Sequence, residues 1–508
     1  MRSVWLWLLT IALAACVGGA RAQDAGTLER IDAFVAQQVA DSGLPGVAIV
    51  VLQDNRAPHV RGFGHDGRGK PISGDTPFPI GSLTKSFTAL LVRKSVDAGQ
   101  LDVDAPVQRW LPWFRVADPD ASSRITLRHL LNQTSGFSRA DGIAPLLGPP
   151  PGRSQGGPAP SGGGERSERG GKRSNRASLD ELTRGLGSVA LNRPVGASFE
   201  YSNLNFVLLA AVLEVATGQP WRELVRTRVL EPLAMTHSHV DHAAARRDGM
   251  TTVHQIVFGV PRARDSVDLL PAFEPTGGLV ASANDMARYL QMLLAGGAAP
   301  GAPSGRVVSA AGVAQLLAPA SPAAHSTLLS ADFDFRYAEG WFVGPFGAAT
   351  DARWHLGSLT PFAAWMVLMP QTKQAVVVLI NANTELPVGG VSAALSRLPI
   401  GIVNLLHGQP APQGLSVRAA YGRFIVIAGI VIALTALLAW RAARARRAWG
   451  RVLLACAAVA SAGAALAAGL GPSLLWIFAP EAAAVLAALL SLLLAPLAWR
   501  ALAPRRRP

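Results

Sequence analysis

The sequence predicts a mixed α/β (α+β) domain, in which an antiparallel sheet is flanked by helices and joined to a helical subdomain, followed by three C-terminal transmembrane helices. Two observations lead to this fold class. Strand-like patterns lie towards both ends of residues 23–415 and helix-like patterns fill the middle, so the sheet is expected to draw strands from both ends. Residues 421–508 then change to long apolar runs separated by arginines.

Residues 1–22 have the pattern of a secretory signal peptide. Arg2 precedes an apolar run, and the small residues of 20–22 suit cleavage. Leu13–Cys16 also resembles a bacterial lipobox, so lipidation of Cys16 stays open. Either way, this segment is expected to direct export and to lie outside the fold. Cys16 and Cys456 both lie in apolar segments, which excludes a disulfide framework and a thiolate metal site.

The first part of the domain is expected to begin with an amphipathic helix over residues 27–39. A buried strand over residues 47–52 follows, and residues 59–63 are expected to pair with it. The apolar-rich stretch after Ser82 predicts a helix.

Later patterns predict further helices over residues 125–131 and 206–215. Ser282 is expected to cap a helix that runs to Leu294, with Asp285 near the capping-box position. An antiparallel hairpin is expected from two apolar runs, 363–368 and 375–380, with Pro370 and Gln371 at the turn.

Residues 148–176 are rich in Gly, Pro, Ser and Arg and contain almost no large apolar residue. Such a segment cannot bury enough surface to order itself, so it is interpreted as a disordered insertion. A tether to the cell wall or to lipid is the alternative.

Three apolar runs, 424–440, 452–470 and 481–499, approach the length that crosses a bilayer. Arginines cluster between the first two runs and after the third, and the positive-inside rule places both clusters in the cytoplasm. Residues 23–415 are therefore expected on the periplasmic side of the inner membrane. This agrees with the signal peptide.

Aromatic residues near the ends of the first and third runs are interpreted as interfacial anchors; they are Tyr421, Trp440, Trp476 and Trp499. Glu481 is expected to cap the outer end of the third span, and a functional intramembrane carboxylate is the alternative. Much of the net charge of +14 belongs to the anchor and the insertion. Nucleic-acid binding is therefore not expected, whereas attraction to anionic membrane lipid is.

Ser82 and Lys85 combine a nucleophile and a potential base one helical turn apart. A serine hydroxyl attacks poorly unless a neighbour takes its proton, and a partly desolvated lysine can do so. The chain has 47 basic residues, of which only five are lysines. Taken alone, the two residues fit a catalytic pair and a serine N-cap followed by a solvated lysine equally well.

Three motifs in this order, Ser82-x-x-Lys85, Tyr201-Ser202-Asn203 and His355-Leu356-Gly357, resemble the serine β-lactamase and penicillin-binding superfamily. The similar branch holds class C β-lactamases, D-alanyl-D-alanine carboxypeptidases and family VIII esterases. Four further patches support the resemblance, namely residues 99–104, 130–136, 194–196 and 277–280. The resemblance covers about residues 28–385 and implies a β-lactamase/transpeptidase-like fold.

The resemblance implies that Ser82 attacks a carbonyl and forms an acyl-enzyme, with Lys85 and Tyr201 sharing the proton. A nearby cation is expected to lower the phenol pKa of Tyr201. Asn203 would orient the substrate amide or Lys85. The alternatives are a core tyrosine at position 201 and an asparagine that caps a helix beginning near Asn205.

The third motif is implied to lie on an edge strand beside Ser82, where Gly357 allows close backbone approach. The backbone N–H groups of Ser82 and Ser358 would hold the oxyanion. His355 would be a site residue, with a satisfied buried histidine as the alternative. Carboxypeptidases and class C enzymes of this kind carry threonine at the position of Leu356, where its hydroxyl helps to bind a carboxylate.

Leu356 therefore favours a neutral ester or another amide as substrate. The alternatives are a peptidoglycan-directed carboxypeptidase or β-lactamase, and a catalytically silent binder of cell-wall peptides. No cofactor is expected. The partners are a small-molecule or peptide substrate, which includes cell-wall peptides, and membrane lipid; the oligomeric state stays open.

The sequence His237-Ser238-His239-Val240-Asp241-His242 also matches a zinc signature of metallo-hydrolases. That signature normally follows an apolar strand. Here it follows a Pro-Leu-Ala-Met stretch that resembles a helix end of the serine family. It is interpreted as a chance match, and no metal is expected.

Overall fold

The structure is a computed structural model. It describes residues 26–54, 56–143, 178–264, 271–299, 301–302, 304–326, 333–359, 361–384, 391–414 and 416–444, with 484–485, 487–489 and 491. The predicted signal peptide, the insertion, the second membrane span and most of the third span lie outside the described residues.

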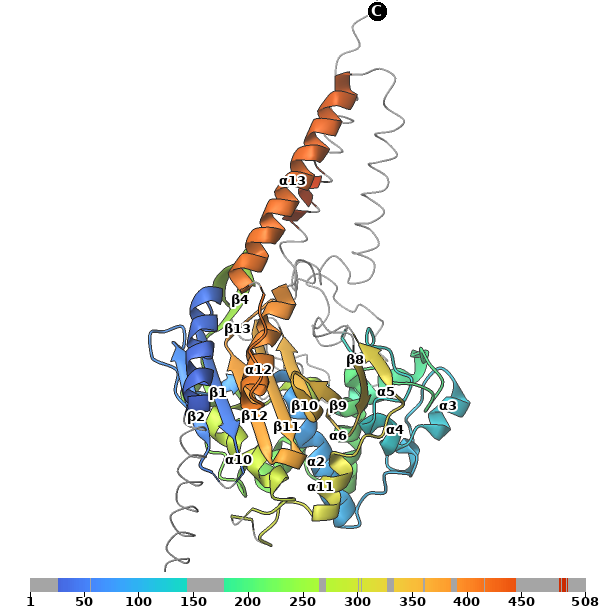
Figure 1. Cartoon of the computed structure of the whole chain (residues 1–508). Coiled ribbons are helices and arrows are strands. Elements are labelled where there is room, and N and C mark those ends of the chain that lie inside the picture. Colours follow the sequence, from blue (N-terminus) through green and yellow to red (C-terminus); the bar gives the residue numbers. More distant parts are fainter. Residues whose placement is uncertain are drawn as a thin grey trace, which may run out of the picture.

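The main sheet is antiparallel and has eight strands in the order β2-β1-β12-β11-β10-β9-β8-β7 (Figure 1). β1 pairs with β12, which confirms that both ends of the domain contribute to one sheet. The predicted hairpin is β11 and β12, joined at Pro370–Thr372. The strands are β1 (Gly46–Leu52), β2 (His59–Gly64), β7 (Ala324–Ser326), β8 (Phe333–Tyr337), β9 (Phe342–Phe346), β10 (Ala349–Leu359), β11 (Phe362–Met369) and β12 (Gln374–Ile380).

Two hydrophobic clusters lie on opposite faces of this sheet. Alternate residues of β1 enter different clusters, Val47 on one face and Ala48 on the other, as strand geometry requires. Residues 26–42 are helical, as predicted, and with α12 (Val391–Leu406) they cover one face. The central strands read as continuous apolar runs because both faces are buried.

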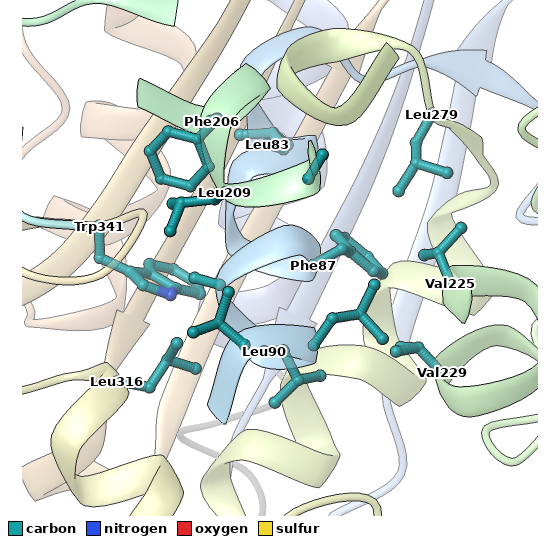
Figure 2. Close-up of a cluster of buried hydrophobic side chains, with 14 of the residues drawn as sticks. Leu83, Phe87, Leu90, Phe206, Leu209, Val225, Val229, Leu279, Leu316 and Trp341 are labelled. Carbon is teal, nitrogen blue, oxygen red and sulfur yellow. The ribbon is translucent and has the colours of Figure 1, made fainter. Parts of the chain in front are cut away.

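The other face carries the helical part of the domain. Figure 2 shows part of its packing, with Leu83 near Phe206 and Leu209 on one side and Phe87 towards Val225 on the other. The helices are α2 (Thr84–Asp97), α3 (Pro119–Arg124), α4 (Leu127–Leu131), α5 (Leu179–Arg184), α6 (Asn203–Thr217), α7 (Trp221–Val225), α8 (His242–Arg247), α9 (Glu274–Gly277), α10 (Ala283–Leu294) and α11 (Ala310–Leu316).

The predicted cap of α10 is confirmed, because the Ser282 side chain accepts from the Asp285 backbone N–H at 3.2 Å. Two small sheets complete the domain, β13-β4-β5 and β3-β6. Their strands are β3 (Phe78–Pro79), β4 (Val253–Val257), β5 (Val260–Arg264), β6 (Val280–Ala281) and β13 (Ala382–Asn383).

Helix α13 (Val417–Arg444) leaves the domain as a long rod (Figure 1). It is the one helix among the described residues that is by itself long and apolar enough to cross a membrane. Tyr421 is 1% exposed, and its hydroxyl bonds Thr384 Oγ1 at 2.7 Å and donates to the Ile256 carbonyl at 2.8 Å. The prediction of Tyr421 as an interfacial aromatic is therefore wrong, because its polar tip is satisfied inside the domain.

A buried ion pair ties α2 to the loop between β8 and β9. Arg93 on α2 bonds both carboxylate oxygens of Glu339, and both side chains are almost fully buried. The next residue, Gly340, has a φ of 80°, and a Cβ there would lie 3.0 Å from the Lys85 carbonyl oxygen. The pair thus holds this loop against the turn of α2 that carries Lys85.

Arg93→Met is expected to destabilise the protein by about 3–5 kcal/mol, because it leaves the Glu339 carboxylate buried without its partner. Replacing both residues, Arg93→Met with Glu339→Leu, is expected to cost much less. Thermal unfolding of the purified protein in detergent measures both. Arg128→Met is the matched control, since it breaks an exposed pair with Asp104 and should cost about 0–1 kcal/mol. A single variant no less stable than the double variant would contradict the expectation.

Candidate active site

Ser82 lies on a short 3-10 turn, Gly81–Leu83, that leads directly into α2. Gly81 has a φ of 52°, in the left-handed region that favours glycine. The Thr84 hydroxyl donates to the Gly81 carbonyl at 2.7 Å, which fixes the turn. Ser82 is half-buried, so its hydroxyl is held at the end of a buried helix while part of it stays accessible.

Lys85 is fully buried at the start of α2. Its Nζ lies 3.1 Å from Ser82 Oγ and 2.8 Å from the Thr276 carbonyl oxygen, on α9. No carboxylate forms an ion pair with it in the described part of the chain. Burial, with the nearby charge of Arg139, holds the pKa of Lys85 well below its ordinary value. A neutral amine is therefore favoured beside the hydroxyl.

The Tyr201 hydroxyl completes this arrangement by donating to Ser82 Oγ at 3.0 Å. Lys85 Nζ lies 5.0 Å from the centroid of the Tyr201 ring. Burial raises the pKa of Tyr201 to about 12, although the Ser82 hydrogen bond and Arg139 act in the opposite direction. The expectation that a nearby cation lowers this pKa is wrong, because desolvation of the phenolate outweighs it.

Gln133 fixes the backbone that presents Tyr201. Its side-chain Oε1 accepts from the Ser202 N–H at 2.9 Å, and its carbonyl accepts from the Glu200 N–H at 2.9 Å. Gln133 is buried and has a φ of 58°, which is unusual for a non-glycine residue. Sequence reasoning recognised its motif, residues 130–136, but assigned this residue no task.

Gly357 brings β10 against the Ser82 turn. A Cβ at Gly357 would lie 2.0 Å from the Ile80 carbonyl oxygen and 3.3 Å from the Ser82 nitrogen, so only glycine fits. β10 lies inside the sheet and is not its edge strand, which corrects the prediction. However, β9 pairs with β10 only up to Trp354 in the described residues, and beyond Trp354 the strand packs at Gly357 against the Ser82 turn.

Ser358 is the other expected oxyanion donor. Its hydroxyl accepts from Asn383 Nδ2 at 2.8 Å. Asn383 precedes Thr384, whose hydroxyl bonds Tyr421 at the first turn of α13. The strand that borders the site is thus joined to α13 through two consecutive residues, Asn383 and Thr384. The oxyanion assignment of the Ser358 N–H stays a prediction.

Asn203 does not contact Lys85. It is the first residue of α6, and its Nδ2 donates to the Gly142 carbonyl at 3.0 Å. No hydrogen bond joins it to Lys85 among the described residues. Asn205 instead accepts from the Ser135 hydroxyl at 2.5 Å. Asn203 therefore anchors the loop at Gly142, and the helix begins two residues earlier than expected.

His355 lies behind the site and is 1% exposed. Its Nδ1 bonds the Leu356 carbonyl at 2.7 Å, so this nitrogen carries the proton. Its Nε2 therefore accepts from the Tyr337 hydroxyl at 3.1 Å. Burial lowers the pKa of His355 to about 3, which keeps the imidazole neutral. The structure thus favours the alternative of a satisfied buried histidine, and Tyr337 is a partner that sequence reasoning missed.

The residues of the zinc-like motif do not share one set of partners. His237 and His239 both contact Asp248, at 3.0 and 2.7 Å. Asp241 instead caps α8, and His242 Nε2 bonds the Gly278 carbonyl at 3.0 Å. Over the ranges that the structure describes, no group of three or more His, Cys, Asp or Glu residues is arranged to hold a metal ion.

Comparison with known proteins identifies a family model and several relatives. The Beta-lactamase family model matches residues 31–398. "Protein flp" of Staphylococcus aureus is 23% identical over 363 residues, which are 70% of this chain and 63% of that protein. The chain thus spans less than two thirds of the length of this relative. "Penicillin-binding protein 4" of Amycolatopsis lactamdurans is 29% identical over 289 residues, 56% of this chain and 67% of that protein.

Solved structures share the fold. An octameric penicillin-binding protein homologue from Pyrococcus abyssi has a TM-score of 0.59 at 22% identity, covering 76% of this chain and 79% of that chain. The D-amino acid amidase from Ochrobactrum anthropi SV3, complexed with D-phenylalanine, has a TM-score of 0.58 at 19% identity, covering 76% and 100%. These matches confirm the predicted β-lactamase/transpeptidase-like arrangement.

Lys85→Met is expected to stabilise the fold relative to the wild type, and the more so as the pH falls below the ordinary lysine pKa of 10.5. The unfolded chain binds a proton at Lys85 below pH 10.5, whereas the folded chain binds it only below a lower pKa. Wild-type stability therefore falls in this window as pH falls, by up to about 1.4 kcal/mol per pH unit. The variant lacks this loss.

Thermal unfolding midpoints of Lys85→Met and the wild type, measured at several pH values below 10.5, give the difference in stability. Lys373→Met, which removes an exposed lysine paired with Asp54, is the matched control. A stability difference between Lys85→Met and the wild type that does not change with pH would show that Lys85 keeps its proton in the fold.

Proposed function

Because the chain belongs to the Beta-lactamase family, we propose that it is a membrane-anchored, exported serine hydrolase that cleaves an ester or amide through an acyl-enzyme on Ser82. One observation carries the proposal. Ser82 Oγ lies within hydrogen-bond distance of both the buried Lys85 amine and the Tyr201 hydroxyl. A nucleophile contacted by a neutral base and a second proton donor is the arrangement that acyl transfer needs.

The proton has a defined route. Lys85 takes the proton of the Ser82 hydroxyl as Oγ bonds to the substrate carbonyl carbon. The backbone N–H groups of Ser82 and Ser358 bind the resulting oxyanion. As the bond to the leaving group breaks, Tyr201 donates its proton to the leaving oxygen or nitrogen, and Lys85 replaces that proton. A water molecule then attacks the acyl-enzyme with the same groups acting in reverse.

The end of β10 that lies beside Ser82 supports an uncharged substrate. Among the described residues β9 does not pair with β10 beyond Trp354, and Gly357 brings this end of the strand against the Ser82 turn. Leu356 provides no hydroxyl, and His355 is neutral. This strand therefore supplies no cation for a substrate carboxylate, which favours a neutral ester or amide.

Arg139 favours the second candidate, a carboxypeptidase-type enzyme that acts on cell-wall peptides. It is exposed, and its charge reaches both Lys85 and Tyr201. An arginine at this position can bind the terminal carboxylate of a peptide. A catalytically silent binder is disfavoured by the close contacts among Ser82, Lys85 and Tyr201.

We propose that the catalytic domain, residues 23–415, lies on the periplasmic side of the inner membrane, with membrane lipid as a partner. The signal-like residues 1–22 and the apolar helix α13 support this assignment. The three spans, at 424–440, 452–470 and 481–499, remain part of the proposal. Residues 424–440 lie within α13, whereas the other two lie mostly outside the described residues.

A fluorophosphonate or a fluorescent penicillin is expected to form a covalent adduct on Ser82, located by mass spectrometry of the digested protein. Ser82→Ala should abolish the adduct. Ser86→Ala, which changes a buried hydroxyl one turn further along α2, is the matched control and should keep it. Absence of an adduct with both probes in the folded wild type would support the silent binder instead.

Initial rates on short-chain esters, D-amino-acid amides, D-Ala-D-Ala peptides and nitrocefin distinguish the substrate classes. Hydrolysis of esters or amides is expected to exceed that of nitrocefin and carboxylate-terminated peptides. If Arg139 binds a carboxylate, Arg139→Ala should raise KM for D-Ala-D-Ala peptides and leave KM for their C-terminal amides unchanged. That result would establish the second candidate over the first.

Values of kcat/KM are expected to rise with pH through the lowered pKa of Lys85, because only the neutral amine accepts the Ser82 proton. Lys85→Arg should lose activity by several orders of magnitude, since guanidinium stays protonated. His355→Gln should leave the pH of the inflection unchanged, because the pKa of His355 is about 3. An inflection that moves with His355→Gln would assign the titration to the imidazole.

A further inference from the structure

Most of the exposed large hydrophobic side chains in the described residues lie along α13, from Ile425 to Leu437. Outside that helix, the exposed ones in the described part of the chain are Val215, Phe258 and Val260. Phe258 and Val260 are 42% and 46% exposed, and both lie at the tip of the β4–β5 hairpin. An exposed aromatic and an exposed aliphatic side chain on one hairpin tip indicate a surface that meets an apolar partner.

The backbone of the β4–β5 turn is strained at Phe258, the residue whose side chain it exposes. Val257 pairs with Val260, so the loop contains only Phe258 and Gly259. Both have positive φ, 49° and 78°. Two-residue turns of this kind favour Asn or Gly at the first position, and a phenylalanine there is conformationally costly. A strained aromatic at an exposed tip is a reason to look for a function.

The hairpin is fixed to the first turn of α13. The Tyr421 hydroxyl donates to the Ile256 carbonyl of β4 at 2.8 Å, and a Cβ at Gly259 would lie 3.2 Å from Tyr421 Cβ. Figure 1 shows β4 at the base of α13, where the helix leaves the domain. The exposed apolar surface of α13 begins one turn later, at Ile425. The hairpin tip and the start of the apolar rod are therefore neighbours.

Basic side chains accompany the apolar tip. Arg262 and Arg264 are exposed on β5, and Arg264 Nε donates to Gln255 Oε1 at 3.0 Å. Arg423 is exposed on α13 just before its apolar stretch. Arginines can bind the anionic headgroups of a bilayer, and the neighbouring apolar side chains can enter its acyl boundary.

We propose that the β4–β5 hairpin is a second membrane contact, in which Phe258 and Val260 enter the bilayer interface and Arg262 and Arg264 bind anionic lipid headgroups. The inference rests on the proposed anchoring of the chain by α13. It goes beyond that anchoring, because a second contact fixes the orientation of the domain on the membrane. β13 pairs with β4 and carries Asn383, the partner of Ser358, so this orientation places the Ser82 site next to the bilayer surface.

Spin-label accessibility on the full chain tests the proposal. Single cysteines replace Val260, Val215 or Ile430 in a background with Cys16→Ala and Cys456→Ala, reconstituted in nanodiscs of phosphatidylcholine with or without phosphatidylglycerol. Collisions with oxygen exceed those with a nickel complex where a label lies in lipid. Val260→Cys is expected to show this excess, and Val215→Cys, equally exposed but on α6, the reverse. Arg262→Glu with Arg264→Glu should lower the excess at Val260, and only in the anionic nanodiscs.

The label at Ile430, on the exposed surface of α13, separates the two proposals. A water-exposed Ile430 label would overturn the anchoring itself. An Ile430 label in lipid with a Val260 label that matches Val215 would overturn only the hairpin contact. A Val260 label shielded from both reagents would also overturn it, since protein would then cover the tip.

Discussion

The burial of Lys85 without a counter-charge is the constraint on which the site depends. The amine has two polar neighbours, Ser82 Oγ and the Thr276 carbonyl, and neither carries a charge. A protonated amine in this position would lose its hydration with no carboxylate to replace it. In the proposed mechanism this amine is the base, and its burial comes at the expense of stability. The packing of α2 against α6 provides the compensating apolar burial.

The same burial shifts the pKa values of the titratable groups of the site in different directions. It lowers the pKa of Lys85 and raises that of Tyr201, so the amine gives up its proton while the phenol keeps its own. His355 is neutral for the same reason. In the proposed mechanism these shifts set the direction of proton transfer, from Ser82 to Lys85 and from Tyr201 to the leaving group. A scheme that begins with a phenolate conflicts with these directions.

Sequence patterns predicted those elements whose stabilising contacts lie within a few residues of one another. The strand β1, the β11–β12 hairpin and the Ser282 cap were predicted because periodicity and capping act within a few residues. The proximity of Ser82 and Lys85 also follows from one helical turn. The partners of Asn203, His355 and Tyr421 were not predictable in this way, because each is set by a distant segment. Strands β7–β9 were not predicted. They are short, and they are recognised mainly by their pairing with neighbouring strands, which the sequence alone does not show.

Tyr421 illustrates why α13 cannot be treated as separate from the domain. Val417, Ala420 and Tyr421 belong to the same hydrophobic cluster as β1 and β12, so the core of the domain continues into the first turn of α13. From Tyr421 a hydrogen bond reaches Thr384, and the adjacent Asn383 reaches Ser358 on the strand beside the nucleophile. A tilt of α13 relative to the sheet would have to break these contacts or carry β10 with it. Helix α13 and the strand that borders Ser82 therefore form one mechanical unit.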